Sequence, residues 1–560
     1  MATAWTWNLT PPRSFGETRT MKYTAVRSFC LLLVVVTLAS CTKQQPVNVS
    51  VATPKLGIRP TGDEKIHPDM SKVSPDLRRV FDYIDAHIDE HAENLQKWIR
   101  QPSISNSGEG IPESAEMVKG FFDKLGCQTT RVYDVGITEY GTPGNPVVYA
   151  KCDEGAPKTL VVYWMYDTMP VTQPDLWVSP PFEARILNGK DVGLPKYPKV
   201  LIGRGAVNSK GPEMAQLNAI MSMRAVMGKL PVNLIFVAEG DEERMDIGLR
   251  QFMRDHSDLF KGADAMYGYG GSEGCVYVEL TTSGKSWGHG PLDSDIHGAN
   301  KRQVDSPAWR HIKMLSSLVS EDGNTPKIAG FFDNIQPLNA SEKEMLKKQA
   351  SKINMKEAAA NLGVADFIKN DPLDMLTMAD YGTSFNLDGV WGGNMYAGGA
   401  GAILPNKITS KHNMRYVPNM NGLDLVKKLR AQLDRNGYKD VQLKLIGDVP
   451  WSKVSHDSDI ARATDEMYEQ FGLPQPVHPD RASILGGYWP SYLFSDGPVG
   501  EKVGNVSIPI GGSQVGFGDR AHAANEFYVI EGADKVYGLA GDEKSVAAVI
   551  YNYAQLSARH

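Results

Sequence analysis

The chain has 560 residues, of which 42% are hydrophobic and 22% charged, and its formal net charge is −6. This length exceeds what one hydrophobic core usually supports, so we expect two domains with flanking segments. The sequence contains no long basic block, which argues against nucleic acid as a partner.

The N-terminus has the order of features that is typical of an export signal. Lys22 and Arg27 precede an apolar run at 29–39. This run is too short to span a bilayer, but it fits the hydrophobic region of a signal peptide. Residues before Met21 fit no part of such a signal, so Met1 and Met21 are both candidate starts.

The expected signal ends in a short motif. Residues 38–41, Leu-Ala-Ser-Cys, resemble a bacterial lipobox, which implies cleavage before Cys41 and lipidation of its sulfur. We therefore predict a signal peptide over 1–41 and an exported bacterial lipoprotein, anchored to the membrane and facing the periplasm. Residues 42–75 are expected to form a flexible tether.

Three cysteines follow the lipobox, at Cys127, Cys152 and Cys275. An odd number at irregular spacing indicates neither a disulfide framework nor a zinc knuckle. We interpret all three as small buried hydrophobic residues.

Helix and strand patterns alternate along the first half of the chain, which is typical of an α/β domain. Apolar residues recur at helical spacing over 76–100, and further helices are predicted over 113–125 and 210–227. Buried strands are predicted over 160–162, 200–202 and 232–238.

Polar side chains follow each of these three strands. Asp167 follows the first, Asn208 follows the second, and Glu242 and Glu243 follow the third. Open α/β sheets build their sites where strands end, so we expect these side chains to meet. The pattern predicts hydrolytic chemistry at this edge of the sheet.

The pattern changes after residue 275. Strands are predicted over 276–282, 408–416 and 441–446, and helices over 306–319, 423–433 and 457–471, with a largely helical stretch at 324–380. The last strands of the first domain are expected around 506–510. We predict a discontinuous catalytic domain of residues 76–275 and 451–560, interrupted by an inserted domain of residues 276–450.

These segments resemble the M20 family of metallopeptidases and deacylases, especially its carnosinase-like dipeptidase branch. In that family the first strand ends in His-x-Asp, the second carries Gly-Arg-Gly-Ala-x-Asp-x-Lys-Gly, and the third ends in paired glutamates. The corresponding stretches of this chain are 165–167, 203–211 and 242–243. The resemblance implies a zinc-exopeptidase-like α/β domain, an inserted α+β lid or dimerisation domain, and a homodimer.

The resemblance also implies an altered metal site. Met165 stands where the family has His, Asn208 where an Asp bridges two metals, and Gly270 where it has a second Asp. Glu243 and His522 match the remaining ligands of one metal. We therefore expect one zinc or other divalent ion per chain, held by Asn208, Glu243 and His522, because a single dication needs less negative charge around it.

Four further roles follow from the resemblance. Glu242 matches the family's general base, and Asp167 matches the carboxylate that supports the ligands. His297 matches a lid histidine that polarises the scissile carbonyl in the partner's active site. Arg415 matches the arginine that grips the carboxylate of the substrate.

The expected substrate loop departs from the family. Gly486, Gly487 and Tyr488 stand where the dipeptidase branch has Gly-Gly-Ser. Tyr488, together with Trp489, reshapes or narrows the pocket, so the dipeptide preference of the family need not transfer.

We predict a hydrolase of an amide bond in small peptides or N-acyl amino acids. One alternative is a catalytically inactive, peptide-binding lipoprotein with the same fold, because ancestry alone does not establish activity. Another is a scaffold turned to different chemistry, with or without a metal. The residues do not rank these two alternatives.

Overall fold

A computed structural model describes residues 56–268, 270–454, 457–473 and 487–556. The expected signal peptide and lipobox lie outside the described residues, as do Gly486 and residues 42–55 of the expected tether. Within the described ranges, none of the helices combines the length and the apolarity needed to cross a membrane.

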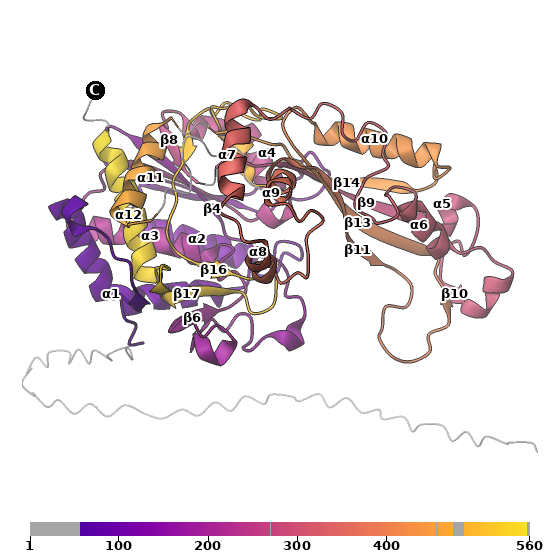
Figure 1. The fold of residues 1–560 in the computed structure, drawn as a ribbon, viewed down its shortest axis with the longest axis horizontal. Helices are drawn as coiled ribbons and strands as arrows, with labels where there is room; N and C mark the ends of the chain where they lie inside the picture. Colours follow the sequence, from indigo (N-terminus) through magenta and orange to yellow (C-terminus); the bar gives the residue numbers. More distant parts are fainter. Residues whose placement is uncertain (1–55, 269, 455–456, 474–486, 557–560) are drawn as a thin grey trace, which may run out of the picture. The chain divides into compact units, whose positions relative to one another are not determined.

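A six-stranded mixed sheet forms the centre of the first domain (Figure 1). Its order is β15 (Ile510–Gly511), β8 (Ala265–Tyr267), β4 (Thr159–Met165), β7 (Asn233–Glu239), β3 (Val147–Cys152) and β2 (Thr129–Tyr133). Neighbours from β15 to β7 are parallel, whereas β3 is antiparallel to both β7 and β2. This is the α/β architecture expected from the sequence, with an antiparallel edge on a parallel sheet.

Successive residues of these strands contact two separate cores, one on each face of the sheet. Leu160 and Val162 belong to the core on one face, and Val161 and Tyr163 to the core on the other. The first face is covered by α1 (Pro75–Ile99), α2 (Ile111–Leu125), α3 (Lys210–Met227), α11 (Asp459–Gln470) and α12 (Leu539–Leu556), and the second mainly by α4 (Ile247–His256). Figure 1 shows α1, α3 and α12 side by side.

A second, four-stranded sheet holds the strand that carries the Gly-Arg-Gly-Ala stretch. Its order is β16 (Gly518–Asp519), β17 (Phe527–Glu531), β6 (Lys199–Ile202) and β5 (Arg185–Asn188). β17 was missed by the sequence analysis, whereas the strand expected around 506–510 is reduced to β15. Pro509 has no N–H to donate, although its carbonyl accepts the N–H of Met266.

Residues 56–74 pack on the catalytic domain, so the prediction of a tether reaching residue 75 was wrong for this part. Ile58 and Val73 are buried in the main core. β1 (Asp63–Glu64) pairs in parallel with β18 (Ala533–Asp534). These isolated apolar residues lie in a polar stretch, so no periodic signal in the sequence marks their burial, and the ion pair of Arg59 with Glu531 also holds this segment.

Cys127 and Cys152 form a disulfide, and Cys275 is a free, buried cysteine. The prediction that all three are unpaired was therefore wrong for two of them. Cys127 precedes β2 and Cys152 ends β3, and the pairing of Thr129 with Lys151 brings the two ends together. The spacing along the chain carries no sign of this contact because it arises from strand pairing.

The inserted segment contains a four-stranded antiparallel sheet, which we call the lid sheet. Its order is β11 (Ser384–Trp391), β13 (Lys407–Tyr416), β9 (Gly274–Ser283) and β14 (Gln442–Val449). Helices α6 (Pro307–Ser316) and α10 (Gly422–Arg435) pack on it around a core of their own. Further elements of the insert are α5 (Gly284–Trp287), β10 (Ile296–His297), α7 (Ala340–Ala350), α8 (Met355–Leu362), α9 (Pro372–Tyr381) and β12 (Ile403–Leu404).

Candidate functional site

Three predicted ligands meet in one place. Asn208 Nδ2 donates to Glu243 Oε1 at 2.8 Å and lies 3.0 Å from His522 Nε2. His522 Nε2 and Glu243 Oε1 are also 3.0 Å apart, and this hydrogen bond raises the pKa of His522. The three side chains come from the loop after β6, the 3-10 helix after β7, and the loop between β16 and β17.

The loop that carries Asn208 is fixed by the carboxylate of Glu526. Arg204 Nη1 donates to Glu526 Oε2 at 2.8 Å, and both side chains are buried. Burial raises the pKa of Glu526, and the bonds it accepts compensate for the loss of water. Three backbone N–H groups donate to it at 2.9–3.0 Å, those of Gly205, Val207 and Asn208.

Asp167 lies behind the glutamate pair. Its carboxylate accepts the N–H of Glu242 at 3.3 Å and the N–H of Glu243 at 3.1 Å. Burial, reinforced by the negative charge of Glu243, raises the pKa of Asp167 to about 8. Because these contacts are with the backbone of the pair, Asp167 positions Glu242 and Glu243.

Glu242 has the environment of a proton acceptor. Its side chain makes no hydrogen bond with the described residues and is partly exposed. Burial raises the pKa of Glu242 well above its ordinary range, and the charges of Glu243 and Asp167 raise it further. A bound cation would oppose that shift and favour the carboxylate, the form that can take a proton from water.

Met165 and Gly270 supply no side-chain ligand. The Met165 side chain lies in the apolar core of the second face, while its N–H donates to Glu213 Oε1 at 2.6 Å. The Gly270 carbonyl accepts Trp489 Nε1 at 2.8 Å and Ser491 Oγ at 2.7 Å. These two positions are therefore used for packing and for anchoring a loop.

The donor set fits one weakly held ion. Across the described part of the chain, no three His, Cys, Asp or Glu side chains form a cluster suited to a metal. The amide of Asn208 takes the place of a third such group, and rotation of that amide would turn its oxygen toward Glu243 and His522. One carboxylate, one imidazole and one amide oxygen can bind a divalent ion and leave a position open.

Arg415 lies beside the expected substrate loop. Its Nη1 donates to Glu273 Oε1 at 3.0 Å, and its Cζ is 4.9 Å from the centre of the Tyr488 ring. Glu273 also accepts the N–H of Gly487 at 3.0 Å. The structure thus brings Arg415, Gly487 and Tyr488 together, while Gly486 lies outside the described residues. Glu273 was missed by the sequence analysis because a lone carboxylate before a strand has no distinguishing pattern.

His297 lies in the lid, where its backbone pairs with Ile403 of β12. It ends β10, its side chain is exposed, and its Nδ1 accepts the N–H of Ala299 at 3.1 Å. Its role in a partner's site stays a prediction.

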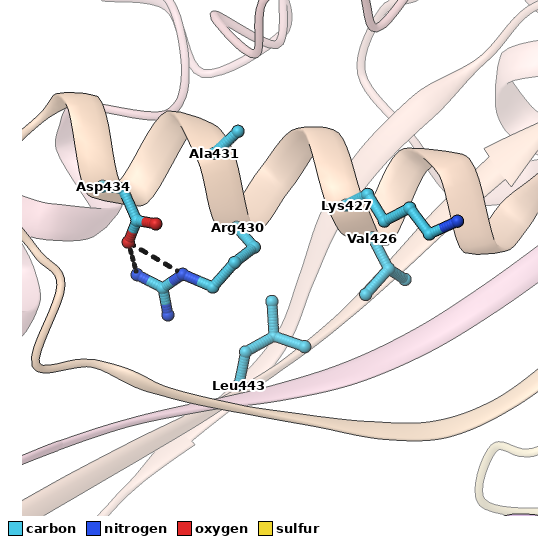
Figure 2. A pocket seen from close by; sticks show the side chains of 6 residues that line it. All are labelled: Val426, Lys427, Arg430, Ala431, Asp434 and Leu443. Atoms are coloured by element: carbon cyan, nitrogen blue, oxygen red, sulfur yellow. Dashed lines mark hydrogen bonds and ion pairs between the residues drawn. The ribbon is translucent and has the colours of Figure 1, made fainter.

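A shallow groove of about 430 Å³ lies on the lid, between α10 and β14. Figure 2 shows Arg430 turned back onto Asp434, which neutralises its charge. The groove contains none of the site residues, so it has no part in chemistry at the glutamate pair. It is lined by Val426, Lys427, Arg430, Ala431, Asp434 and Leu443.

The fold and the site define a two-domain α/β hydrolase with a glutamate pair at its centre. The chain belongs to peptidase family M20/M25/M40, whose profile matches residues 165–538.

Several curated relatives are dipeptidases. The Cys-Gly metallodipeptidase DUG1 of Candida albicans is 28% identical over 484 residues, covering 80% of this chain and 93% of the relative. The Beta-Ala-His dipeptidase of Homo sapiens is 26% identical over 481 residues, covering 81% and 90%. The resemblance to the carnosinase-like branch is therefore confirmed, and the chain is an M20-type hydrolase.

Solved structures give the same fold. The dipeptidase Dug1p from Saccharomyces cerevisiae superposes with a TM-score of 0.70 at 24% identity, over 86% of this chain and 98% of that one. Human carnosine dipeptidase 1 gives a TM-score of 0.69 at 21% identity, over 86% and 100%.

Proposed function

We propose that this protein hydrolyses an amide bond in dipeptides or N-acyl amino acids, assisted by one divalent ion per chain. The observation that carries the proposal is the meeting of Asn208, Glu243 and His522 within 3.0 Å of one another, beside Glu242. A neutral amide in place of a carboxylate suits one dication rather than two.

The side chains of the site have separate roles in the proposed reaction. Asn208, Glu243 and His522 would hold the ion, which as a Lewis acid would activate water and polarise the scissile carbonyl. Glu242 accepts a proton from the attacking water and returns it to the leaving amine nitrogen as the C–N bond breaks. Asp167 keeps Glu242 in place through the backbone.

The substrate is held by its carboxylate. Arg415 offers a guanidinium already oriented by Glu273 Oε1 at 3.0 Å and by the face of Tyr488. A second acidic group on the ligand bound at Arg415 is disfavoured because Glu273 already supplies a negative charge. This arrangement favours substrates with one free carboxylate, such as a dipeptide or an N-acyl amino acid.

The metal content tests the proposal directly. Protein reconstituted with Zn²⁺ and dialysed is expected to retain one ion per chain by elemental mass spectrometry, and to hydrolyse members of a dipeptide and N-acyl amino acid library. Two tightly held ions, or none, would contradict the one-ion site.

A matched variant restores the ligands of the family. Met165→His, Asn208→Asp and Gly270→Asp combined in one chain should raise the zinc content toward two ions. Hydrolysis that appears only in this triple variant would show that the native site has been retired.

We also propose a homodimer formed through the lid. β11 is an edge strand of the lid sheet, and it exposes Leu387 and Val390, with exposed fractions of 47% and 50%. An exposed apolar edge is a surface that a second copy can cover. Light scattering should give twice the mass of one chain, and Leu387→Lys with Val390→Lys should reduce it to one. A monomeric parent protein would remove the role given to His297.

We also propose that the protein is exported as a lipoprotein. Support comes from the Cys127–Cys152 disulfide, because disulfides persist mainly in oxidising compartments. Labelling with a palmitate analogue should mark the parent protein, and Cys41→Ala should abolish the label. A labelled Cys41→Ala variant would refute the lipobox.

A further inference from the structure

Three hydrogen bonds anchor the loop at 487–491 to the segment between β8 and β9. The N–H of Gly487 donates to Glu273 Oε1 at 3.0 Å. Trp489 Nε1 and Ser491 Oγ both donate to the carbonyl of Gly270, at 2.8 and 2.7 Å. Gly270 and Glu273 lie between β8 and β9. The loop is therefore anchored at Gly270 itself, the residue that stands where the family has a second aspartate. The backbone on both sides of residue 488 is therefore held in a fixed position.

Tyr488 is the side chain that this loop presents. Its ring lies under the guanidinium of Arg415, 4.9 Å from Cζ, and 6.5 Å from the ring of Tyr277 in an edge-on arrangement. Two ring contacts fix the direction of the phenol. Its hydroxyl has no hydrogen-bond partner among the described residues, and the residue is partly exposed.

The electrostatics keep this hydroxyl protonated. Burial raises the pKa of Tyr488 well above its ordinary range, and the negative charges of Glu242 and Glu243 raise it further. A phenol in that state can donate a hydrogen bond but cannot act as a base.

We propose that the Tyr488 hydroxyl donates a hydrogen bond to the carbonyl oxygen of the scissile amide, stabilising the negative charge that develops there. This inference rests on the proposed function. It gives the scissile carbonyl a hydrogen-bond donor from the same chain, in addition to the contacts that the ion and the lid histidine would supply.

The step balances without any further reactant. The oxygen of water forms a bond to the carbonyl carbon as the carbonyl π electrons move onto oxygen, and Glu242 accepts the proton that water loses. Tyr488 keeps its own proton and shares it with the oxyanion. When the oxyanion collapses, the C–N bond breaks and Glu242 returns its proton to the amine nitrogen.

Tyr488→Phe removes the hydroxyl and keeps the ring on Arg415. We expect kcat to fall by about 10² to 10³, the usual effect of losing one oxyanion donor, with KM changed less than about twofold. Affinity for a phosphinic pseudodipeptide, which carries the tetrahedral oxyanion, should fall by a similar factor. Tyr277→Phe is the matched control, because this neighbouring phenol is also partly buried near Glu243; it should keep kcat within about threefold.

Several outcomes would overturn the inference. An unchanged kcat in Tyr488→Phe would do so, as would a raised KM at constant kcat, or an equal loss in Tyr277→Phe. If Tyr488→Phe does not fold, 3,5-difluorotyrosine at the same position keeps the shape and changes the acidity of the donor, and an unchanged kcat and pH profile would count against the inference.

The assay separates this inference from the proposed function. A parent protein that hydrolyses no member of the library overturns both. A parent protein that turns over substrate at the same rate as Tyr488→Phe leaves the proposed function standing and overturns the role of Tyr488 alone.

Discussion

Replacement of Glu242 by Gln is the sharpest single test of hydrolysis. Gln keeps the length and volume of the side chain but cannot accept a proton from water. Loss of a general base typically costs about 10² to 10⁴ in rate, or about 2.7–5.5 kcal/mol in the activation barrier. The Glu242 side chain makes no hydrogen bond with the described residues, and its N–H would still donate to Asp167. The loss should therefore fall on kcat and leave the zinc content unchanged.

The stability of the same variant should change in the opposite direction. Burial and the neighbouring charges of Glu243 and Asp167 disfavour a charged Glu242, which is why its pKa is raised. A neutral amide removes that repulsion, so the melting temperature should rise in the absence of metal.

Three measurements decide the matter: kcat on a hydrolysed dipeptide, zinc content, and thermal unfolding. Glu243→Gln is the matched control, because it should lose zinc as well as activity. A Glu242→Gln protein with kcat within about threefold of the parent would refute the assignment of the base.

Four other variants test separate parts of the structure. His522→Ala should lose the bound zinc, and retention of the ion would show that it sits elsewhere. Arg415→Ala should raise KM by about tenfold to a hundredfold with little change in kcat, measured on free and carboxamide-capped dipeptides; equal loss on both would contradict carboxylate binding. Burial lowers the pKa of His91, but the Glu543 carboxylate 2.6 Å from its Nδ1 outweighs this and raises the pKa above the ordinary 6.5. The ion pair is therefore fully stabilising below pH 6.5, and it weakens as the pH rises through the raised pKa. We expect His91→Gln to lower the free energy of unfolding in urea by about 1.5–3 kcal/mol near pH 6 and by less near pH 9. Cys152→Ser opens a loop of 25 residues and should cost about 3 kcal/mol, unless the parent cysteines are free to react with a thiol reagent.

The parts of the fold that could be predicted are those fixed by local pattern. The helix expected over 210–227 is α3, because apolar spacing and the Gly that follows define it locally. Asn208 and Glu243 could be placed together because each follows a predicted strand, and His522 was added through the family resemblance. Their contacts at 2.8–3.0 Å agree with that reasoning.

The parts that could not be predicted depend on partners distant in the chain. The pairing of β6 with β17 joins residues more than 300 positions apart, since Ile202 faces Phe527. Glu273 holds Arg415 across the lid sheet, where Cys275 pairs with Arg415. Such contacts follow from sheet register, which neither composition nor periodicity records.

The contact between Asn208 and Glu243 lets these two side chains stay together without an ion. Nδ2 lies 2.8 Å from Oε1, a spacing that suits a donor and an acceptor. An aspartate at 208 would set two carboxylates at that distance and would need a cation between them. The amide therefore makes the folding of this part of the protein independent of metal, and Asn208→Asp alone should lower the melting temperature of the metal-free protein.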